Sequence, residues 1–299
     1  VDELLEEICR KEFESDSVVS VCLHPKQLIC AYGVGKMCRL VSFENHKLKD
    51  IDCKFQNESS ISQQRVILFS KNGKRLVTGG SDGCVRIYSF PLDNKNVNKP
   101  LRELKLKEDE IQAAAIAPNA QTVAVITDGF LQVFRVDSGA PLATINAPMS
   151  GKLNQRFRGC CFLHDSDYFV TGQMVPNSRR QPGASILTKW HISKSDVKSV
   201  ESKKVGIEHH TTIALNQKGD LIATCNPEGT ISAFAVDNGF STVMKPKKVH
   251  GFVIGGIAFA IDAKDAKAGE KSVAADAPLL VSVSLDHSIA ITRIVFSSW

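Results

Sequence analysis

The sequence predicts an all-β protein: a seven-bladed β-propeller whose first blade is incomplete in this chain. Short apolar runs alternate with polar links that contain Gly, Pro or Asp, and extended amphipathic helix patterns are scarce. The runs group into units whose first strands begin near Val19, Val66, Gln112, Phe157, Thr211 and Val253, at spacings of 42 to 54 residues. Four strands in a repeat of roughly 40–45 residues are typical of a propeller blade. We therefore expect one domain over residues 1–299.

A turn rich in Gly, Asp or Asn recurs between the second and third strands of each unit. The clearest example is Gly79-Gly80-Ser81-Asp82-Gly83, which could cradle a phosphate or simply close a β-hairpin. A P-loop needs Gly-Lys-Ser/Thr at the start of a helix, whereas the residues from Cys84 onward alternate as in a strand. We predict a turn, with glycine at positive φ and Asp82 accepting backbone hydrogen bonds. The equivalent turns lie at residues 33–36, 81–83, 128–129, 227–229 and 286–288.

The repeats are degenerate and WD-repeat-like. Tyr88 follows Asp82 by six residues, where a WD repeat has its tryptophan, and Thr292 follows Asp286 at the same interval. His250 and the glycine after it open the last unit in the manner of the Gly-His element of a WD repeat. We expect His250 to bond Asp286 or Ser284 in a structural network rather than in catalysis.

Closure of a propeller predicts the seventh blade. Residues 2–13 resemble the last strand of a blade whose leading strands would precede Val1. A propeller closes only when the edge strands are paired. The chain, which begins with Val, is expected to be a piece of a longer protein.

Composition favours a soluble globular protein without covalent chemistry. Hydrophobic residues make up 43% and charged residues 23%, and the net charge of +5 is scattered rather than clustered, which disfavours a nucleic-acid surface. The nine cysteines contain no CxxC and fit reduced core thiols. The sequence contains no apolar run of about 18 residues, the length that would predict a membrane span. The eight histidines show no metal-ligand spacing, and no nucleophile motif is present.

Two loops depart from a minimal blade. Residues 174–183 carry Arg179 and Arg180, a secondary basic loop that could meet an acidic partner or phosphate, although a solvated loop is the alternative. Residues 261–278 are rich in Ala, Lys and Asp without apolar periodicity, so we expect a mobile insertion in the last blade.

The order of these units resembles a known family. The stretches that carry the resemblance are FSKNGKRLVTGGSDGCVRIYSFP, FRGCCF, PNSRRQPGASILTKWHIS, VHGFVIGGIAF and LLVSVSLDHSIAITRI. They are similar to the cytosolic WD-repeat domain of the endoplasmic reticulum (ER) guanine nucleotide exchange factor for the COPII small GTPase, the prolactin regulatory element-binding protein family. Trp190 stands at a family position and is expected in the core.

The resemblance implies an exchange factor that binds the GDP-bound and nucleotide-free GTPase, on the cytosolic face of the ER membrane. Coat or ER exit-site proteins are possible further partners, and no specific nucleic acid is expected. The family carries a glycine-rich loop with a potassium ion in its first blade and a C-terminal membrane helix. This sequence has no four-glycine run, so the catalytic loop maps to no residue here and is expected before Val1. We expect no cofactor in the chain itself.

The face of the missing loop can still be mapped. Turns between second and third strands emerge where loops join successive blades, so the neighbouring blades should form the rim of the GTPase contact. We predict this rim at Asp16, Ser17, Val18, Gly35, Lys36, Asp286 and His287. Asp286 could instead be purely structural. A non-catalytic WD-repeat scaffold and a nucleic-acid binder remain as alternatives, the second without a clustered basic face or recognition helix.

Overall fold

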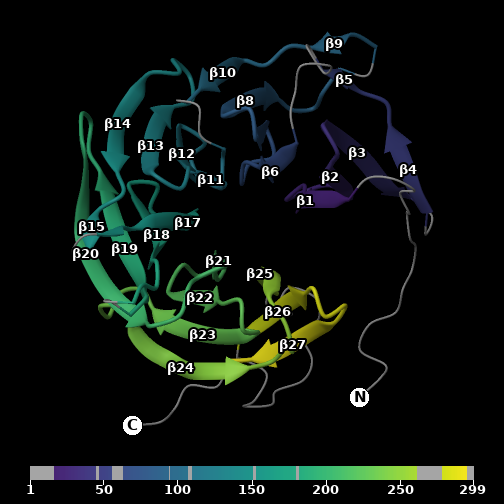
Figure 1. Ribbon diagram of the computed structural model, residues 1–299. Coiled ribbons are helices and arrows are strands. Elements are labelled where there is room, and N and C mark those ends of the chain that lie inside the picture. Colours follow the sequence, from purple (N-terminus) through teal and green to yellow (C-terminus); the bar gives the residue numbers. More distant parts are fainter. Residues whose placement is uncertain are drawn as a thin grey trace. The chain divides into compact units, whose positions relative to one another are not determined.

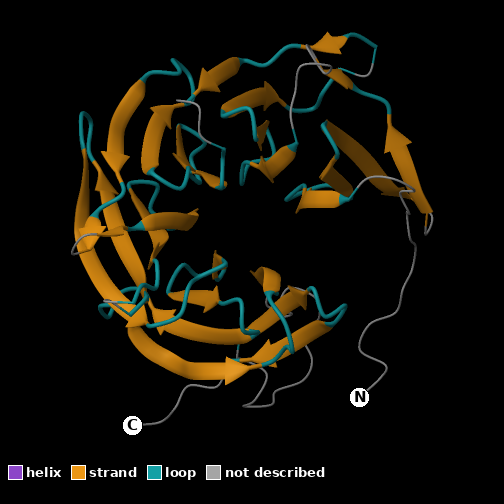
Figure 2. Ribbon diagram, in the orientation of Figure 1, coloured by secondary structure: helices purple, strands orange, loops and turns teal. Residues whose placement is uncertain are grey.

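The computed structural model describes residues 17–44, 47–55, 63–93, 95–106, 110–150, 153–179, 182–260 and 278–294. Every regular element in these ranges is a β-strand (Figure 2). The prediction of an all-β protein is therefore confirmed for the part of the chain that the structure describes.

Six antiparallel meander sheets, numbered here as blades in chain order, contain most of the strands (Figure 1). Blades 1 to 5 have four strands each and blade 6 has three, counted over the described residues. Blade 1 contains β1 (Val18–Leu23), β2 (Ile29–Val34), β3 (Met37–Glu44) and β4 (Lys47–Ile51). Blade 2 contains β6 (Gln64–Phe69), β7 (Arg75–Gly80), β8 (Cys84–Ser89) and β10 (Arg102–Lys105). Blade 3 contains β11 (Ala113–Ile116), β12 (Thr122–Ile126), β13 (Phe130–Arg135) and β14 (Pro141–Asn146).

The remaining blades follow the same order. Blade 4 contains β17 (Arg156–Phe162), β18 (Tyr168–Val175), β19 (Ala184–Ile192) and β20 (Val197–Gly206). Blade 5 contains β21 (Thr212–Leu215), β22 (Leu221–Cys225), β23 (Thr230–Ala235) and β24 (Ser241–Lys248). Blade 6 contains β25 (Ile254–Phe259), β26 (Leu279–Ser284) and β27 (Ile289–Arg293). Two small pairs complete the strands: β5 (Lys54–Phe55) with β9 (Val97–Asn98), and β15 (Met149–Ser150) with β16 (Leu153–Asn154).

These sheets confirm the β-propeller fold class and the repeat positions. Each predicted first strand begins within two residues of an observed one, from β1 at Val18 to β25 at Ile254. The structure differs in blade number, because the described residues hold six blades. Residues 2–13, on which the prediction of a further blade rested, lie outside the described residues, as do 261–277 of the predicted insertion.

The chain forms two compact units, which are described separately. The first contains residues 1–128 and 132–144, and the second contains residues 129–131 and 145–299. In the first unit, β6 packs against β1, β2 and β11, around a buried cluster that includes Leu40, Leu76 and Tyr88. In the second, β21 packs against β17 and β25. The prediction of one domain over residues 1–299 stays a prediction.

The turns between second and third strands depend on backbone freedom at one residue. Gly83 has a φ of 70° and Gly229 a φ of 81°, a region that side chains with a Cβ rarely adopt. His287 takes the corresponding position in blade 6 with a φ of 63°. These turns bring the second and third strands into antiparallel register, and they place polar residues at one end of each blade.

The cysteines are structural. The eight cysteines in the described ranges are free thiols. Burial raises the pKa of Cys161 to about 12 and also raises the pKa of Cys160, so neither is a thiolate at neutral pH. No helix in the described ranges is long and apolar enough to cross a membrane.

Candidate functional site

Four residues of the predicted rim lie at one end of blade 1. Val18 pairs with Val34, the last residue of β2, and so stands beside the turn formed by Gly35 and Lys36. Gly35 has a φ of 54°, and the Lys36 side chain is exposed. Ser17, also exposed, precedes Val18 at the same end. Asp16 lies outside the described residues. The blade therefore gathers these residues at one end, as its topology predicted.

The other part of the predicted rim, Asp286 and His287, forms the turn between β26 and β27 in the second unit. The backbone N–H of Gly251 donates to Asp286 Oδ2 at 2.8 Å, and the N–H of Ser288 donates to Oδ1 at 3.0 Å. The Ser288 hydroxyl also donates to Asp286, and this bond is the main cause that lowers the pKa of the carboxyl. Both carboxylate oxygens are thus used within the blade, which favours a structural role for Asp286.

His250 completes this network from inside the blade. Its Nδ1 lies 2.7 Å from Ser288 Oγ and 3.5 Å from Asp286 Oδ2, and its Nε2 lies 2.8 Å from Ser282 Oγ. The sequence predicted Asp286 or Ser284 as the partner of His250. Asp286 lies within ion-pair distance of the ring but is not its hydrogen-bond partner, since both ring nitrogens bond serine hydroxyls. Ser284 instead donates to the carbonyl of Val253 at 3.0 Å.

Two exposed apolar side chains beside this turn were missed in the sequence. Phe252 is 59% exposed and Leu285 is 64% exposed. They lie together at the end of the blade, because the Leu285 N–H donates to the Val253 carbonyl and the Ser284 hydroxyl lies 3.2 Å from the Phe252 carbonyl. His287 is exposed in the same turn. Single exposed apolar side chains are common on protein surfaces, and this pair is of interest because it lies beside the predicted rim residue His287.

The glycine-rich turn of blade 2 closes a hairpin, as predicted. Asp82 Oδ1 accepts a hydrogen bond from the Cys84 N–H at 3.2 Å. Asp82 and Glu103 both bind the buried Arg86, at 2.8 and 3.0 Å. Arg86 was not predicted to take part in this turn, although residues four apart in an extended segment can share a face. The Asp82 carboxylate of this turn is paired with Arg86, so the turn does not present a free cation to a phosphate.

The remaining predicted residues lie in blade 4. Trp190 is buried, and its Nε1–H donates to Thr171 Oγ1 at 2.7 Å, which confirms its expected core position. Arg179 is exposed in the loop after β18, and Arg180 lies outside the described residues. The role of this pair as a secondary basic loop stays a prediction.

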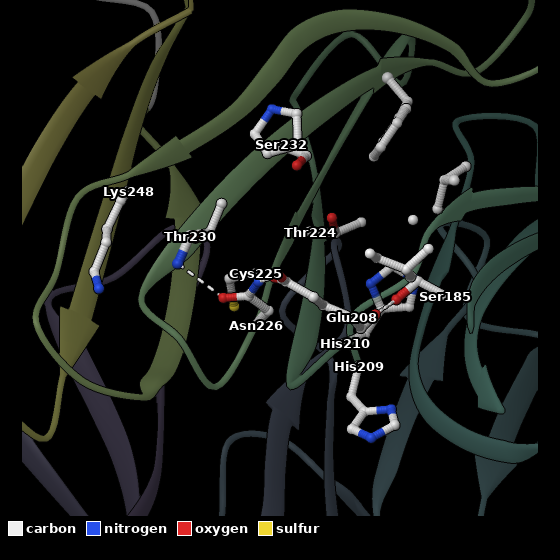
Figure 3. A pocket seen from close by; sticks show the side chains of 15 residues that line it. Ser185, Glu208, His209, His210, Thr224, Cys225, Asn226, Thr230, Ser232 and Lys248 are labelled. Atoms are coloured by element: carbon white, nitrogen blue, oxygen red, sulfur yellow. Dashed lines mark hydrogen bonds between the residues drawn. The ribbon is translucent and has the colours of Figure 1, made fainter. Parts of the chain in front are cut away.

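A cavity of about 490 Å³ opens in the second unit, at the junction of blades 4 and 5 (Figure 3). It was not predicted. The segment 207–210, which joins β20 to β21, forms one side, and the ends of β22 and β24 form another. Among the residues that the structure describes, no group of three or more His, Cys, Asp or Glu side chains could hold a metal ion. The polar residues at the cavity include Ser185, Glu208, His209, His210, Thr224, Asn226 and Lys248.

Comparison with known proteins gives one repeat-family match and several SEC12 relatives. The family model "WD domain, G-beta repeat" matches residues 39–89, which include most of the third strand and all of the fourth strand of blade 1 and the first three strands of blade 2. The guanine nucleotide-exchange factor SEC12 of Rattus norvegicus is 26% identical over 223 residues, 71% of this chain and 51% of that protein. SEC12-like protein 2 of Arabidopsis thaliana is 22% identical over 296 residues, 94% of this chain and 65% of that protein.

The SEC12 protein of Mus musculus gives a similar match, 25% identical over 223 residues. The chain spans about half the length of the rodent relatives, 51% of each. The WD-repeat match agrees with the antiparallel sheets of blades 1 and 2. The chain thus contains a SEC12-like WD-repeat domain.

Proposed function

We propose that this domain is a guanine nucleotide exchange factor that promotes release of GDP from a small GTPase. The observation that carries the proposal is the similarity to proteins named guanine nucleotide-exchange factor SEC12, over 71% of this chain. Exchange requires no covalent step. A factor that binds the nucleotide-free GTPase more tightly than the GDP-bound form lowers the barrier to GDP release.

The finer proposal concerns the partner and the place. The sequence resemblance supports the small GTPase that initiates COPII coat assembly as the substrate, and the cytosolic face of the ER membrane as the location. The full-length protein would then be anchored by a helix outside this chain. The glycine-rich loop that holds the potassium ion in the resembled family has no counterpart in this sequence.

The GTPase contact is proposed at the strand ends that carry the second-to-third-strand turns. Lys36 supplies an exposed positive charge in blade 1, and His287 an exposed polar side chain in blade 6. Phe252 and Leu285 add apolar surface beside His287. Asp286 holds the turn in shape and so acts through His287 and Leu285 rather than by contact.

The proposal is tested by release of a fluorescent GDP analogue from the COPII GTPase. The 299-residue chain should be compared with a protein extended upstream to include the expected glycine-rich loop. We expect the extended protein to accelerate release. If it accelerates nothing, the exchange-factor proposal is wrong, and a scaffold that binds the GTPase or other coat proteins would account for the fold.

The contact residues need a matched control. Leu285→Ala and Lys36→Glu, made in the extended protein, should each slow release by about threefold to tenfold, since truncated contact residues often cost roughly 1 kcal/mol. Leu28, which is 71% exposed at the opposite end of blade 1, gives the control Leu28→Ala. Equal rates for Leu285→Ala, Lys36→Glu and Leu28→Ala would reject the proposed contact face while leaving exchange itself intact.

A further inference from the structure

The cavity between blades 4 and 5 contains a buried acceptor without a partner. His210 is 4% exposed, and its Nε2 has no hydrogen-bond partner. A backbone hydrogen bond with Ile186 raises the pKa of the ring, as a carbonyl acceptor does, so the other nitrogen, Nδ1, is the donor. Burial nevertheless lowers the pKa of His210 to about 4. The ring is therefore neutral at pH 7, and Nε2 presents a lone pair.

The adjacent residues His209 and His210 differ in the direction in which their rings point. Figure 3 shows His210 among the labelled side chains of the cavity, whereas the ring of His209 points away from them. His209 packs instead against Gly183, where an added Cβ would lie 3.3 Å from His209 Cε1. His209 Nδ1 is also buried without a hydrogen-bond partner, but its ring lies apart from the labelled cavity side chains, so His210 is the ring placed to meet a ligand there. A buried acceptor left unpaired costs on the order of 1–3 kcal/mol, which a donor from a ligand would recover.

Acidic side chains outnumber basic ones at the cavity: Glu208 and Lys248 line it, and Glu228 lies against Glu208. The side-chain amide of Asn226 donates to the Glu208 carboxylate, and the Ser185 hydroxyl donates to the Glu208 carbonyl, so both ends of this residue are fixed. Burial raises the pKa of Glu208, and the charge and hydrogen bond of Glu228 raise it further. Among the described residues, neither carboxyl has a cation within ion-pair distance. Lys248 lines the cavity but pairs with neither.

The walls between these polar groups are apolar. Val205, Ile207, Phe234 and Pro246 contribute them. Such walls suit the methylene stem of a long basic side chain, which packs along apolar surface while its charged end reaches polar groups. A phosphate or another anion is disfavoured, because Glu208 and Glu228 would repel it, Lys248 is the one ammonium group among the lining residues, and neutral His210 has no N–H left to donate through Nε2.

We propose that this cavity binds an arginine or lysine side chain presented by a protein partner, with Glu208 as the counter-ion and His210 Nε2 as the buried acceptor. The proposal is independent of the proposed exchange activity. Arg and Lys carry donors only, and the cavity supplies a carboxylate and a lone pair as acceptors. The site requires no metal and no covalent step.

The test uses the 299-residue chain and small probes. Nα-acetyl-L-argininamide and Nα-acetyl-L-lysinamide are titrated while the ¹⁵N and ring ¹H resonances of His210 are followed by NMR. Nα-acetyl-L-citrullinamide, which has nearly the same shape as the arginine probe but no charge, is the ligand control. We expect a saturable shift of the His210 Nε2 resonance with at least one basic probe. We expect little or no such shift with citrulline.

Two variants identify the groups responsible. Glu208→Gln should weaken binding by about tenfold, the size expected for one charge-assisted hydrogen bond. Glu201→Gln, at a half-buried position on β20 outside the cavity lining, should leave binding unchanged. His210→Asn keeps a donor near Ile186 but removes the Nε2 acceptor, and it should also weaken binding by about tenfold.

Three results would overturn the proposal. The first is the absence of any His210 shift with both basic probes. The second is equal binding of the citrulline probe, which would show that charge plays no part. The third is unchanged affinity in folded Glu208→Gln protein, which would remove the counter-ion.

Discussion

A change from pH 7 to pH 5 should destabilise the second unit through His210. The pKa of this ring falls from 6.5 to about 4 on folding because the ring is buried. Between these values the unfolded chain takes up a proton that the folded ring does not. The contribution is therefore fully present above pH 6.5, is lost progressively as the pH falls toward 4, and is absent below that.

The magnitude follows from the shift. The full pKa difference corresponds to about 3 kcal/mol, of which about 2 kcal/mol lies between pH 7 and pH 5. The substitution His210→Asn removes the titrating group but can keep a donor for the backbone of Ile186. Wild-type protein should thus lose about 2 kcal/mol more of its unfolding free energy than His210→Asn over this pH change.

The assay is urea unfolding at both pH values, followed by tryptophan fluorescence. The chain has two tryptophans, so both proteins carry Trp299→Phe and the buried Trp190 of the second unit is the reporter. Ile213→Val, at a buried position near His210, provides a destabilised control whose deficit should not depend on pH. Equal losses in wild-type and His210→Asn protein would refute the assignment of a buried neutral ring.

Two further substitutions test the turns and the core. Gly229→Ala should lower the unfolding free energy by about 3 kcal/mol or more, because the new Cβ would lie 2.2 Å from the His250 carbonyl oxygen at a φ of +81°. Gly255→Ala has no atom within 4 Å of the added Cβ and should change stability by less than about 1 kcal/mol in the same urea titration. Trp190→Phe leaves the buried Thr171 hydroxyl without its indole donor and should cost about 1–3 kcal/mol, measured by circular dichroism. An unchanged midpoint for Trp190→Phe would show that this hydrogen bond contributes nothing to stability.

The fold could be predicted because its signals are local. Alternating apolar residues define each strand, and a turn that needs positive φ requires Gly or a strained substitute at a fixed place. Both signals are present around Asp82 and Gly83, so the hairpin there was predicted correctly. The His250 network was partly predictable, because histidine at the start of a unit and aspartate at its turn recur together. Ser282 and Ser288 carried no such signal, since serine is common in turns and strands alike.

The cavity could not be predicted, because its lining is scattered from residue 185 to residue 248. The sequence shows His209 and His210 as neighbours, and alternation in an extended segment indicates only that they point apart. Which ring is buried depends on packing against blade 4, where Gly172 lies beside the His210 ring. The acidity of the site likewise depends on Glu228, which approaches Glu208 only once β22 and β23 have formed their turn.

The segment that leads to the exposed Phe252 and the turn that carries Glu228 lie against each other in the second unit. The N–H groups of Val249 and His250 both donate to the Gly229 carbonyl, at 2.9 and 3.1 Å, so the segment that leads to Phe252 lies directly against the turn that carries Glu228. Leu280 and Leu285 show why the exposed apolar pair could not be predicted from the sequence. Leu280 is fully buried in β26, whereas Leu285, just after that strand, is 64% exposed. Both residues are leucines, and they differ only in their position relative to the end of the strand. A protein that contacts Phe252 would therefore lie close to the turn that carries Glu228, within the same unit.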